Sequence, residues 1–488
     1  MNEKIELLKN IPIPDTQIIH VSYESNGAFT SKSGQIFKGL PPFYRVVLKS
    51  KPTNSSLIIS EVWLPEHWNG IYIGLGNGGM AGNICHADLC SKIKEGYAAA
   101  NSDLGTSRGE ESGINNPDVW KDFGWRANEI MTKAAKTIIH THYGTNENYS
   151  YFVGASTGGQ QALSIAQRLP FQYDGIIAGV PANNRIALHV YFLWNHIHLR
   201  SKDGTRFFND SEIQNITDLG VKYFQGLKDS NSGDNFISFP ISGDKLISDF
   251  IAFIANKNPK FTSAQLDALK AVYTGPVNPV TKERIYNGMP IGSEIYGGGI
   301  SDHQAERSPH FYPFIWAFGK EYDGRSFDFN KDMKYIFEKL SKDLNANSAD
   351  LSDFNSHGGK IIMYSGSADP CVPFPDAMNY YKRSAAANGG YENLMTFFRY
   401  FLIPGMDHGN GGCGANVIWN NLKERKEPLC ALRLWRERGI APESLTAVGF
   451  KNKNPEEEIL FSREIYPCGK DDCEKCPPVC CDSYLNEN

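Results

Sequence analysis

The chain lacks an uninterrupted apolar run of the roughly 18 residues that a membrane-spanning helix needs. It also lacks a segment rich in Lys and Arg, and its 49 basic and 54 acidic residues leave a formal charge of −5. We therefore expect neither a membrane nor a nucleic acid as partner. The first 15 residues contain no apolar core of a signal peptide. This predicts a cytoplasmic protein if Met1 is the natural start, and a secreted one is compatible only with a different start.

Cysteine is scarce in the body of the chain. A body of this length with so few cysteines is not a small disulfide-stabilised scaffold. Five of the ten cysteines are spread out: Cys85, Cys90, Cys371, Cys413 and Cys430. The other five crowd the C-terminal tail, 466–488: Cys468, Cys473, Cys476, Cys480 and Cys481.

Aromatic residues are plentiful, at 12% of 488 residues, and favour packed cores over disorder. Short β-branched and apolar runs predict strands, and apolar side chains at helical spacing predict a helix over 125–140. The predicted strands are 45–50, 55–65, 71–76, 95–103, 149–154, 174–181, 360–370 and 397–403. Strands that alternate with helices indicate an α/β fold with a mostly parallel sheet, covered on both faces.

The segment 182–355 interrupts this alternation. It is polar and rich in helix and loop patterns, and strands of the buried type are missing from it. We interpret it as a large inserted lid domain. The catalytic domain would then consist of 1–181 and 356–465.

One motif carries an explicit chemistry. Gly154-Ala155-Ser156-Thr157-Gly158 fits the pattern G-x-S-x-G and lies between a predicted strand and a predicted helix that Pro170 ends. This context is typical of the nucleophile turn of an α/β-hydrolase, where the serine stands at the N-terminus of a helix. The alternative is an ordinary glycine turn.

A nucleophilic serine needs a base, and the base needs a carboxylate that orients it. In this fold the chain order is Ser, Asp or Glu, then His, each after a strand. Asp369 follows the strand that begins at 360, and His408 follows the strand 397–403. Asp407 is the immediate neighbour of His408, so its side chain diverges. We therefore predict the triad Ser156, Asp369 and His408.

An oxyanion hole needs two backbone N–H donors. One is expected from Thr157, the residue after the nucleophile. The other is expected from the glycine-rich loop that follows the strand 71–76, where Gly78 and Gly79 are both candidates. As a phosphate-binding loop this segment fails, because no Lys-Ser/Thr pair follows it.

Over residues 10–465 the chain resembles the tannase/feruloyl esterase family of serine esterases. The segments that carry the resemblance are EVWLPEHWNGIYIGLGNGGMAG, GYAAANSDLGT, YSYFVGASTGGQQAL, YDGIIAGVPA, MYSGSADPCVP and IPGMDHGNGGCG. The resemblance implies an α/β-hydrolase core with a lid, and hydrolysis of esters of aromatic acids such as gallate, ferulate and chlorogenate-like phenolics.

The sequence departs from the family at two positions. The family carries a cysteine just before the nucleophile and another just after the catalytic histidine, and the resemblance implies a disulfide between them. Here these positions hold Ala155 and Gly409. The loss of both fits a reducing compartment. It leaves open what holds Ser156 and His408 in place.

The family also suggests a structural calcium ion in the lid. The matching segment is 226–240, where Asp229, Asn231 and Asp234 supply oxygens. Calcium prefers six to eight oxygen ligands, and this spacing is poor. A calcium loop and a plain polar turn both remain open, and no cofactor is required for the expected reaction.

The cysteine-rich tail is not explained by that chemistry. Cys473 and Cys476 have metal-ligand spacing, and Cys480 and Cys481 could complete a zinc site. Disulfides and free thiols are the alternatives.

The lid is expected to supply the acyl pocket. Aromatic side chains that could stack on a substrate there are Phe311, Tyr312, Phe314 and Trp316, with simple lid core as the alternative. The sequence thus predicts a carboxylic ester hydrolase that acts on a small aromatic ester. An acyltransferase or lactonase with the same triad, and an inactive binding protein, are the competing hypotheses. Neither the particular ester nor the oligomeric state follows from the sequence.

Overall fold

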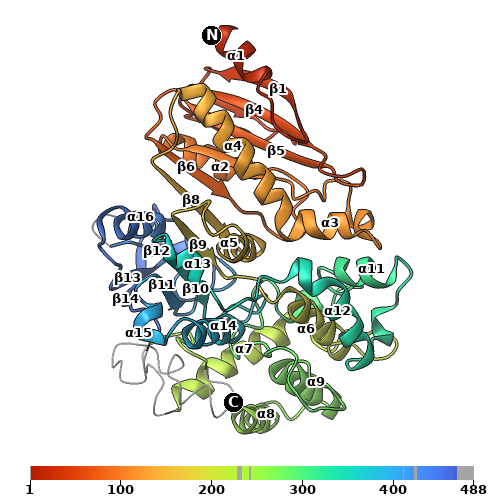
Figure 1. Cartoon of the computed structure of the whole chain (residues 1–488). Helices are drawn as coiled ribbons and strands as arrows, with labels where there is room; N and C mark the ends of the chain where they lie inside the picture. Colours follow the sequence, from red (N-terminus) through yellow and green to blue (C-terminus); the bar gives the residue numbers. More distant parts are fainter. Residues whose placement is uncertain (1, 228–233, 241–242, 410, 422–425, 470–488) are drawn as a thin grey trace.

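A nine-stranded sheet forms the centre of the molecule (Figure 1). It is seen in a computed structural model that describes residues 2–227, 234–240, 243–409, 411–421 and 426–469. The strands, in spatial order, are β1 (Thr16–Glu24), β4 (Phe43–Ser50), β5 (Ile58–Pro65), β7 (Ala98–Ser102), β6 (Ile71–Leu75), β8 (Tyr149–Ala155), β9 (Gly175–Gly179), β10 (Lys360–Gly366) and β11 (Phe398–Ile403). The three pairs from β1 to β7 are antiparallel, and the five pairs from β7 to β11 are parallel.

The strands from β4 onward coincide with the segments predicted from apolar runs. Their side chains alternate between two hydrophobic clusters: Phe152 and Met363 face one side of the sheet, and Tyr151 and Ile362 face the other. Both faces are therefore buried, which is why these strands appear in the sequence as apolar runs and not as alternating patterns.

Helices cover both faces of the sheet. The first face packs against α1 (Asn2–Lys9), α4 (Ala127–Tyr143), α5 (Thr157–Arg168), α13 (Ser352–Ser356) and α14 (Phe374–Ala387). The second packs against α2 (His86–Lys94) and α16 (Pro428–Arg438). The predicted helix over 125–140 is α4, preceded by the 3-10 helix η1 (Glu110–Gly113), α3 (Pro117–Lys121) and the π-helical turn η2 (Asp122–Arg126).

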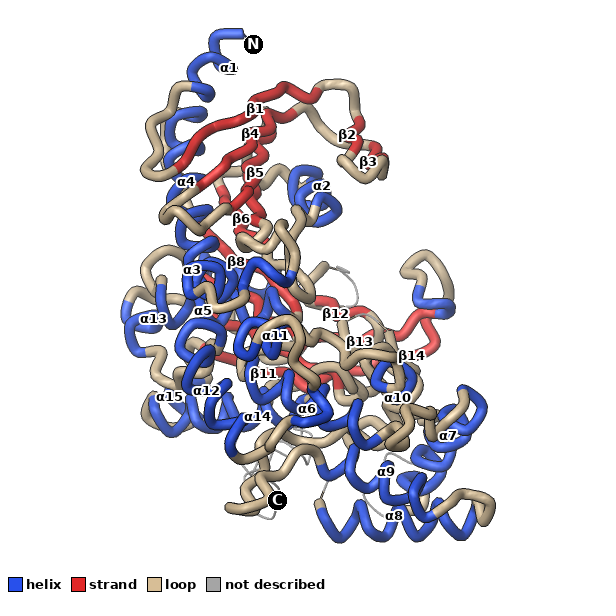
Figure 2. The backbone as a smooth tube through the Cα atoms, turned by 90° about the vertical axis from the view of Figure 1, so that its right-hand side faces the viewer, coloured by secondary structure: helices blue, strands red, loops and turns tan. Residues whose placement is uncertain are grey.

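The described residues between β9 and β10 form helices and loops and add no strand to the sheet. The elements are α6 (Arg185–His198), α7 (Asp210–Gln225), α8 (Asp244–Lys257), α9 (Ser263–Thr274), α10 (Ile300–His303), α11 (Tyr312–Phe318), η3 (Gly324–Ser326), α12 (Lys331–Leu344) and α13. Figures 1 and 2 show most of them grouped at the opposite end of the molecule from β1 and β4.

Three hydrophobic clusters occur in the described part of the predicted lid, 182–355. One lies among α7, α8 and α9, and a small one joins α6 to Tyr286 and Val372. Another joins α6, α11 and α12 to α3 and η2 of the predicted catalytic domain. This last cluster anchors the helices that border the candidate site.

Two smaller sheets, and the edge strand β1, were not predicted from the sequence. One sheet pairs β2 (Ala28–Thr30) with β3 (Ile36–Lys38), and the other contains β12 (Val417–Trp419), β13 (Leu445–Phe450) and β14 (Ile459–Ile465). The strands β2, β3 and β12 are short, and β1 and β14 are largely unburied, so their apolar pattern is weak. The strand β13 is mostly buried and was missed all the same. The remaining elements are α15 (Tyr391–Leu394) and the turn η4 (Lys451–Lys453).

Candidate active site

The turn between β8 and α5 holds Ser156 in a strained backbone conformation, with φ 60° and ψ −118°. Its N–H donates to Gly179 O (2.9 Å), and its carbonyl accepts from Ala182 N–H (3.1 Å). A Cβ on Gly154 would lie 2.4 Å from the carbonyl oxygen of Gly158, so the turn closes only with glycine there. A serine with positive φ at a strand-to-helix turn is the geometry of a nucleophile turn, and the strain is offset by these contacts.

Asp369 and His408 meet beyond the ends of β10 and β11. Asp369 Oδ2 accepts a hydrogen bond from His408 Nδ1 at 2.8 Å. The other carboxylate oxygen accepts from the backbone N–H groups of Cys371 (2.8 Å) and Val372 (2.9 Å). Asp369 is fully buried, whereas the His408 side chain is 23% exposed. A carboxylate held by three donors fixes the ring of a histidine that still reaches solvent.

The electrostatics of His408 follow from this contact. Burial lowers its pKa, but the charge of Asp369 and the hydrogen bond from the ring to it raise the pKa by more, so it ends above 6.5. The neighbouring Asp407 raises the pKa of His408 less than Asp369 does. Its carboxylate accepts from the N–H of Gly411 (2.6 Å), whereas the ring of His408 donates to Asp369.

Ser156, Asp369 and His408 thus follow three parallel strands that end at one edge of the sheet. Among these described residues, no hydrogen bond joins Ser156 Oγ to His408. Such bonds are often long before substrate binds.

The loop after β6 lies against the nucleophile helix. A Cβ on Gly76 would lie 2.5 Å from the Cα of Gly158, so glycine is needed at this contact. Asn77 fixes the loop: its carbonyl accepts from Gly158 N–H (2.7 Å), and its side chain donates to Ser102 O (2.9 Å).

Three backbone N–H groups at this loop have no hydrogen-bond acceptor among the described residues. They belong to Gly78, Gly79 and Thr157. The Thr157 hydroxyl donates to Gly79 O at 2.6 Å and so ties the two sides together. This is what an oxyanion hole requires, and it still leaves Gly78 and Gly79 as alternatives.

Ala155 and Gly409, the positions without the family's cysteines, are not linked. The loop of Gly409 is instead joined to the loop of Asp369. Ala368 N–H donates to Met406 O (3.0 Å), and Gly405 N–H donates to Ser367 Oγ (2.8 Å). These two hydrogen bonds hold the Asp369 and His408 loops together.

Two lid residues beside the site were missed in the sequence. Arg185, 3% exposed, donates to Thr157 Oγ1 at 3.1 Å. His310 has φ 52°, its ring packs beside Phe192, and its Cε1 would lie 3.6 Å from a Cβ on Gly79. Burial, Arg185 and His408 lower the pKa of His310. No sequence motif points to Arg185 or His310. The left-handed backbone of His310 is unusual for a residue other than glycine, but it becomes visible only in the structure.

The lid aromatics predicted to stack on substrate are mostly buried. Tyr312, Phe314 and Trp316 are at most 2% exposed and belong to the cluster shared with α3 and η2. They form lid core in this structure, and contact with a substrate stays a prediction.

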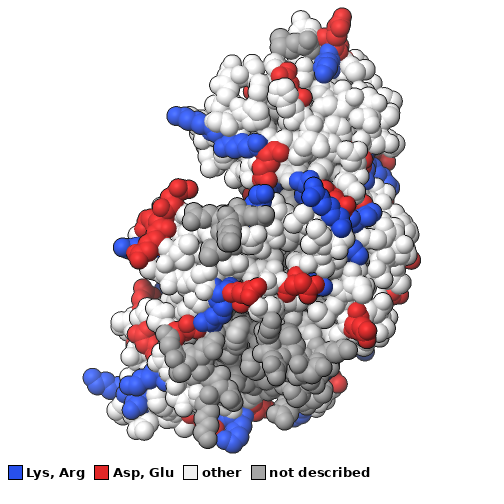
Figure 3. Space-filling view, turned by 90° about the vertical axis from the view of Figure 1, so that its left-hand side faces the viewer, with Lys and Arg blue, Asp and Glu red and all other residues white. Residues whose placement is uncertain are grey.

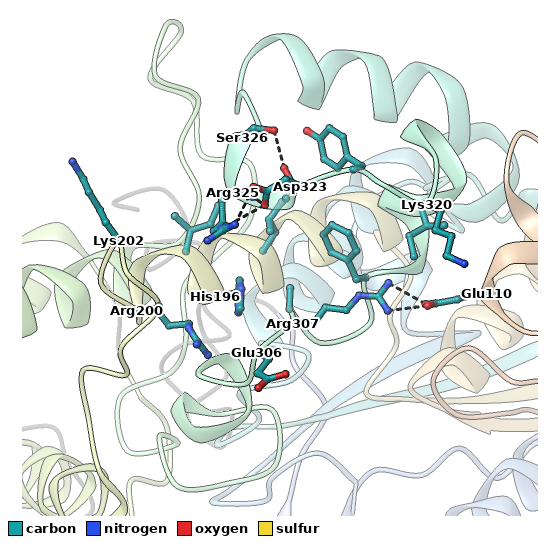
Figure 4. A pocket seen from close by; sticks show the side chains of 18 of the residues that line it. Glu110, His196, Arg200, Lys202, Glu306, Arg307, Lys320, Asp323, Arg325 and Ser326 are labelled. Carbon is teal, nitrogen blue, oxygen red and sulfur yellow. Dashed lines mark hydrogen bonds and ion pairs between the residues drawn. The ribbon is translucent and has the colours of Figure 1, made fainter.

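Phe311 lines a separate cavity of about 880 Å³ (Figure 4). Ion pairs between Arg307 and Glu110 (2.8 Å) and between Arg325 and Asp323 (3.1 Å) border it. None of the residues predicted for the triad or the oxyanion hole lines this cavity.

Of the predicted calcium ligands, only Asp234 lies within the described residues, and its carboxylate pairs with Arg463 at 3.0 Å. Asp229 and Asn231 lie outside them, as do Cys473, Cys476, Cys480 and Cys481.

Cys468 is buried and disulfide-bonded. Over the ranges that the structure covers, no three His, Cys, Asp or Glu side chains gather as a metal-binding group. The calcium and zinc sites stay predictions.

An α/β-hydrolase has this combination of a mostly parallel sheet, a strained serine turn and an Asp–His pair such as Asp369 and His408. The family model of tannase and feruloyl esterase matches residues 44–467, and the chain belongs to that family. It is therefore a carboxylic ester hydrolase.

Relatives agree over nearly the whole chain. An uncharacterised esterase of Xanthomonas campestris pv. campestris is 30% identical, over 94% of this chain and 86% of its own. A probable feruloyl esterase B-2 of Aspergillus flavus is 28% identical, over 86% of this chain and 82% of its own. The crystal structure of feruloyl esterase B from Aspergillus oryzae is similar with a TM-score of 0.83 and 22% identity, over 95% of each chain, which shows the shared fold.

Two observations bear on partners. No helix in the described ranges is long and apolar enough to cross a bilayer. On the face drawn in Figure 3, acidic and basic side chains are interspersed, without a large patch of one sign. The cytoplasmic location and the oligomeric state stay untested.

Proposed function

We propose that the protein hydrolyses esters of aromatic, phenolic acids through an acyl-enzyme, with Ser156 as nucleophile, His408 as general base and Asp369 as its orienting carboxylate. The observation that supports this most is the 2.8 Å hydrogen bond from His408 Nδ1 to the buried Asp369. This pair follows strands that end at the same edge of the sheet as the strand before the strained Ser156. The class of acid is suggested by the names of the feruloyl esterase relatives.

The reaction proceeds in two halves. His408 Nε2 takes the proton of Ser156 as Oγ attacks the ester carbonyl, and the carbonyl oxygen becomes an oxyanion. The N–H groups of Thr157 and of Gly78 or Gly79 stabilise it. Collapse breaks the ester C–O bond, and the alcohol leaves with the proton from His408. Water then attacks the acyl-enzyme by the same route and releases the acid.

Asp369 keeps the histidine in the required tautomer. Because it accepts a hydrogen bond from Nδ1–H, the proton stays on Nδ1 and Nε2 keeps the lone pair that takes the proton of Ser156. The negative charge of Asp369 also stabilises the imidazolium that forms in each half-reaction.

The test is a panel of methyl ferulate, methyl gallate, chlorogenate and p-nitrophenyl acetate, with wild type beside Ser156→Ala. Turnover in wild type that falls about 10⁴-fold or more in Ser156→Ala supports the proposal. Ser356→Ala, an exposed serine on α13, is the matched control and should retain turnover.

Two outcomes would contradict the proposal. Turnover that survives in Ser156→Ala would reject the nucleophile. Fluorophosphonate labelling of Ser156 without hydrolysis of any of these esters would keep the nucleophile and reject the phenolic-ester substrate.

A further inference from the structure

Arg185 is a buried guanidinium at the junction of lid and nucleophile helix. It is the first residue of α6, yet only 3% of its surface is exposed. Nη2 donates to Thr157 Oγ1 and to Gln160 Oε1, both at 3.1 Å, and Nη1 donates to Tyr312 Oη at 3.3 Å. The guanidinium carbon lies 5.3 Å from the centre of the Phe123 ring.

These partners are all neutral. No ion pair between described residues includes Arg185, and its Nε is buried without a hydrogen-bond partner. Burying a cation without a counter-charge is costly, and proteins usually avoid it by pairing. The positive charge is felt nearby: after burial, it contributes to the lowered pKa values of His189 and His310.

The contacts of Arg185 lead directly to the proposed oxyanion hole. Thr157 Oγ1 accepts from Arg185 and donates its own proton to Gly79 O at 2.6 Å. Thr157 lies on one side of the hole and Gly79 on the other. Arg185, Thr157 and Gly79 therefore form a chain of hydrogen bonds that begins in the lid and holds the two sides of the hole together.

The missing counter-charge appears only during the reaction. The tetrahedral intermediate carries a negative oxygen at the N–H groups of this hole, and a fixed positive charge in a water-poor site stabilises that state more than the neutral ester. We propose that Arg185 is a positioning residue of the esterase site: it fixes Thr157 and Gly79, and its unpaired charge stabilises the oxyanion. This inference rests on the proposed function.

The experiment compares Arg185→Met with Arg185→Lys on p-nitrophenyl acetate and methyl ferulate. Methionine removes the charge, and we expect kcat to fall about 100-fold on both esters, with KM changed less than about threefold. Lysine keeps the charge but loses the planar fork, so it should restore part of the loss.

Stability separates this role from a purely structural one. Replacing a buried, unpaired cation by an apolar side chain removes its desolvation cost, so Tm of Arg185→Met should stay the same or rise while kcat falls. Arg399→Met is the matched control. Arg399, near the start of β11 and away from His408, is also buried, at 8% exposure, but it donates to Pro442 O (2.7 Å) and is paired with Glu443 (3.2 Å). It should keep the wild-type kcat.

Thr157→Val provides an independent variant if Arg185→Met does not fold. It removes the hydroxyl that connects Arg185 to Gly79 and keeps the backbone N–H. We expect it to lose more kcat than Thr157→Ser, which keeps a hydroxyl.

Three results would overturn the inference: wild-type kcat in Arg185→Met, equal losses in the Lys and Met variants together with a lower Tm, or equal kcat in Thr157→Val and Thr157→Ser. The proposed function fails separately, when wild type hydrolyses no ester. In that case the rate of fluorophosphonate labelling takes the place of kcat, and unchanged or absent labelling in Arg185→Met relative to wild type rejects the inference.

Discussion

The edge of the sheet and the lid contribute to the site in different ways. The sheet edge supplies Ser156, Asp369 and His408 from turns that follow strands. Backbone groups hold Ser156 and Asp369, and Asp369 holds the ring of His408. The predicted lid supplies Arg185, which donates to Thr157 Oγ1, and His310, whose ring lies beside Gly79. This difference suggests that the sheet edge supplies the reacting groups, whereas the predicted lid adjusts their position and electrostatic surroundings.

Asp369→Asn tests the contribution of the sheet edge and should have the largest effect on kcat. The amide favours the wrong histidine tautomer, so kcat should fall about 10⁴-fold. Wild-type kcat/KM should fall as the pH drops through an apparent pKa above 6.5, because protonated His408 cannot take the proton of Ser156. Without the charge of Asp369 that acid limb should move to lower pH. A pH profile of both proteins measures this, and an unmoved limb would mean that another group sets it.

Trp316→Ala tests whether the buried aromatics of the lid are core or substrate contacts. The side chain is fully buried, and its Nε1 donates to Glu110 O (2.6 Å). We expect the free energy of unfolding to fall by about 3–5 kcal/mol, with KM little changed. Denaturant unfolding and steady-state kinetics on methyl ferulate check this. Phe337→Ala, at an exposed site on α12, is the control and should cost less than about 0.5 kcal/mol. A tenfold rise in KM without loss of stability would instead support stacking.

His310→Ala tests whether the predicted lid contacts substrate at the candidate active site. The imidazole lies beside Gly79, so we expect it to contact substrate through a hydrogen bond. Loss of one such bond should raise KM about threefold to tenfold and change kcat less. His310→Gln keeps donors and an acceptor and should recover part of the affinity. Equal KM values in all three proteins would place the ring outside the substrate site.

A double variant, Ala155→Cys with Gly409→Cys, should have the smallest effect. Ala155 is exposed, and the space around Gly409 is open, but the latter has φ 110°, so cysteine there alone should cost about 1 kcal/mol. Under oxidising conditions we expect a crosslink and a Tm a few degrees above that of the reduced form. Mass spectrometry and thermal unfolding with and without dithiothreitol measure both. Absence of a crosslink would show that the two loops have moved apart relative to the family.

Sequence patterns predicted the sheet edge well because its signals are local. The strands β4 to β11 are buried on both faces and appear as apolar runs, and Gly154 and Gly158 mark a turn that only glycine can close. The strand β12 was missed because it is short, and β14 because it is half-exposed. The lid aromatics were open to two interpretations, since a buried Trp316 and one that stacks on substrate have the same sequence.

By itself, the sequence determined the class of fold, the candidate triad and the family, because strand periodicity, glycine turns and the order Ser, Asp, His are properties of short segments. Only the tertiary structure decided that Asp369 accepts from His408 while Asp407 accepts from Gly411, and that Arg185 lies unpaired against Thr157. Those facts depend on the directions of side chains that are between 28 and 39 positions apart in the chain. Such directions are set by how strands and helices pack, which no local pattern specifies.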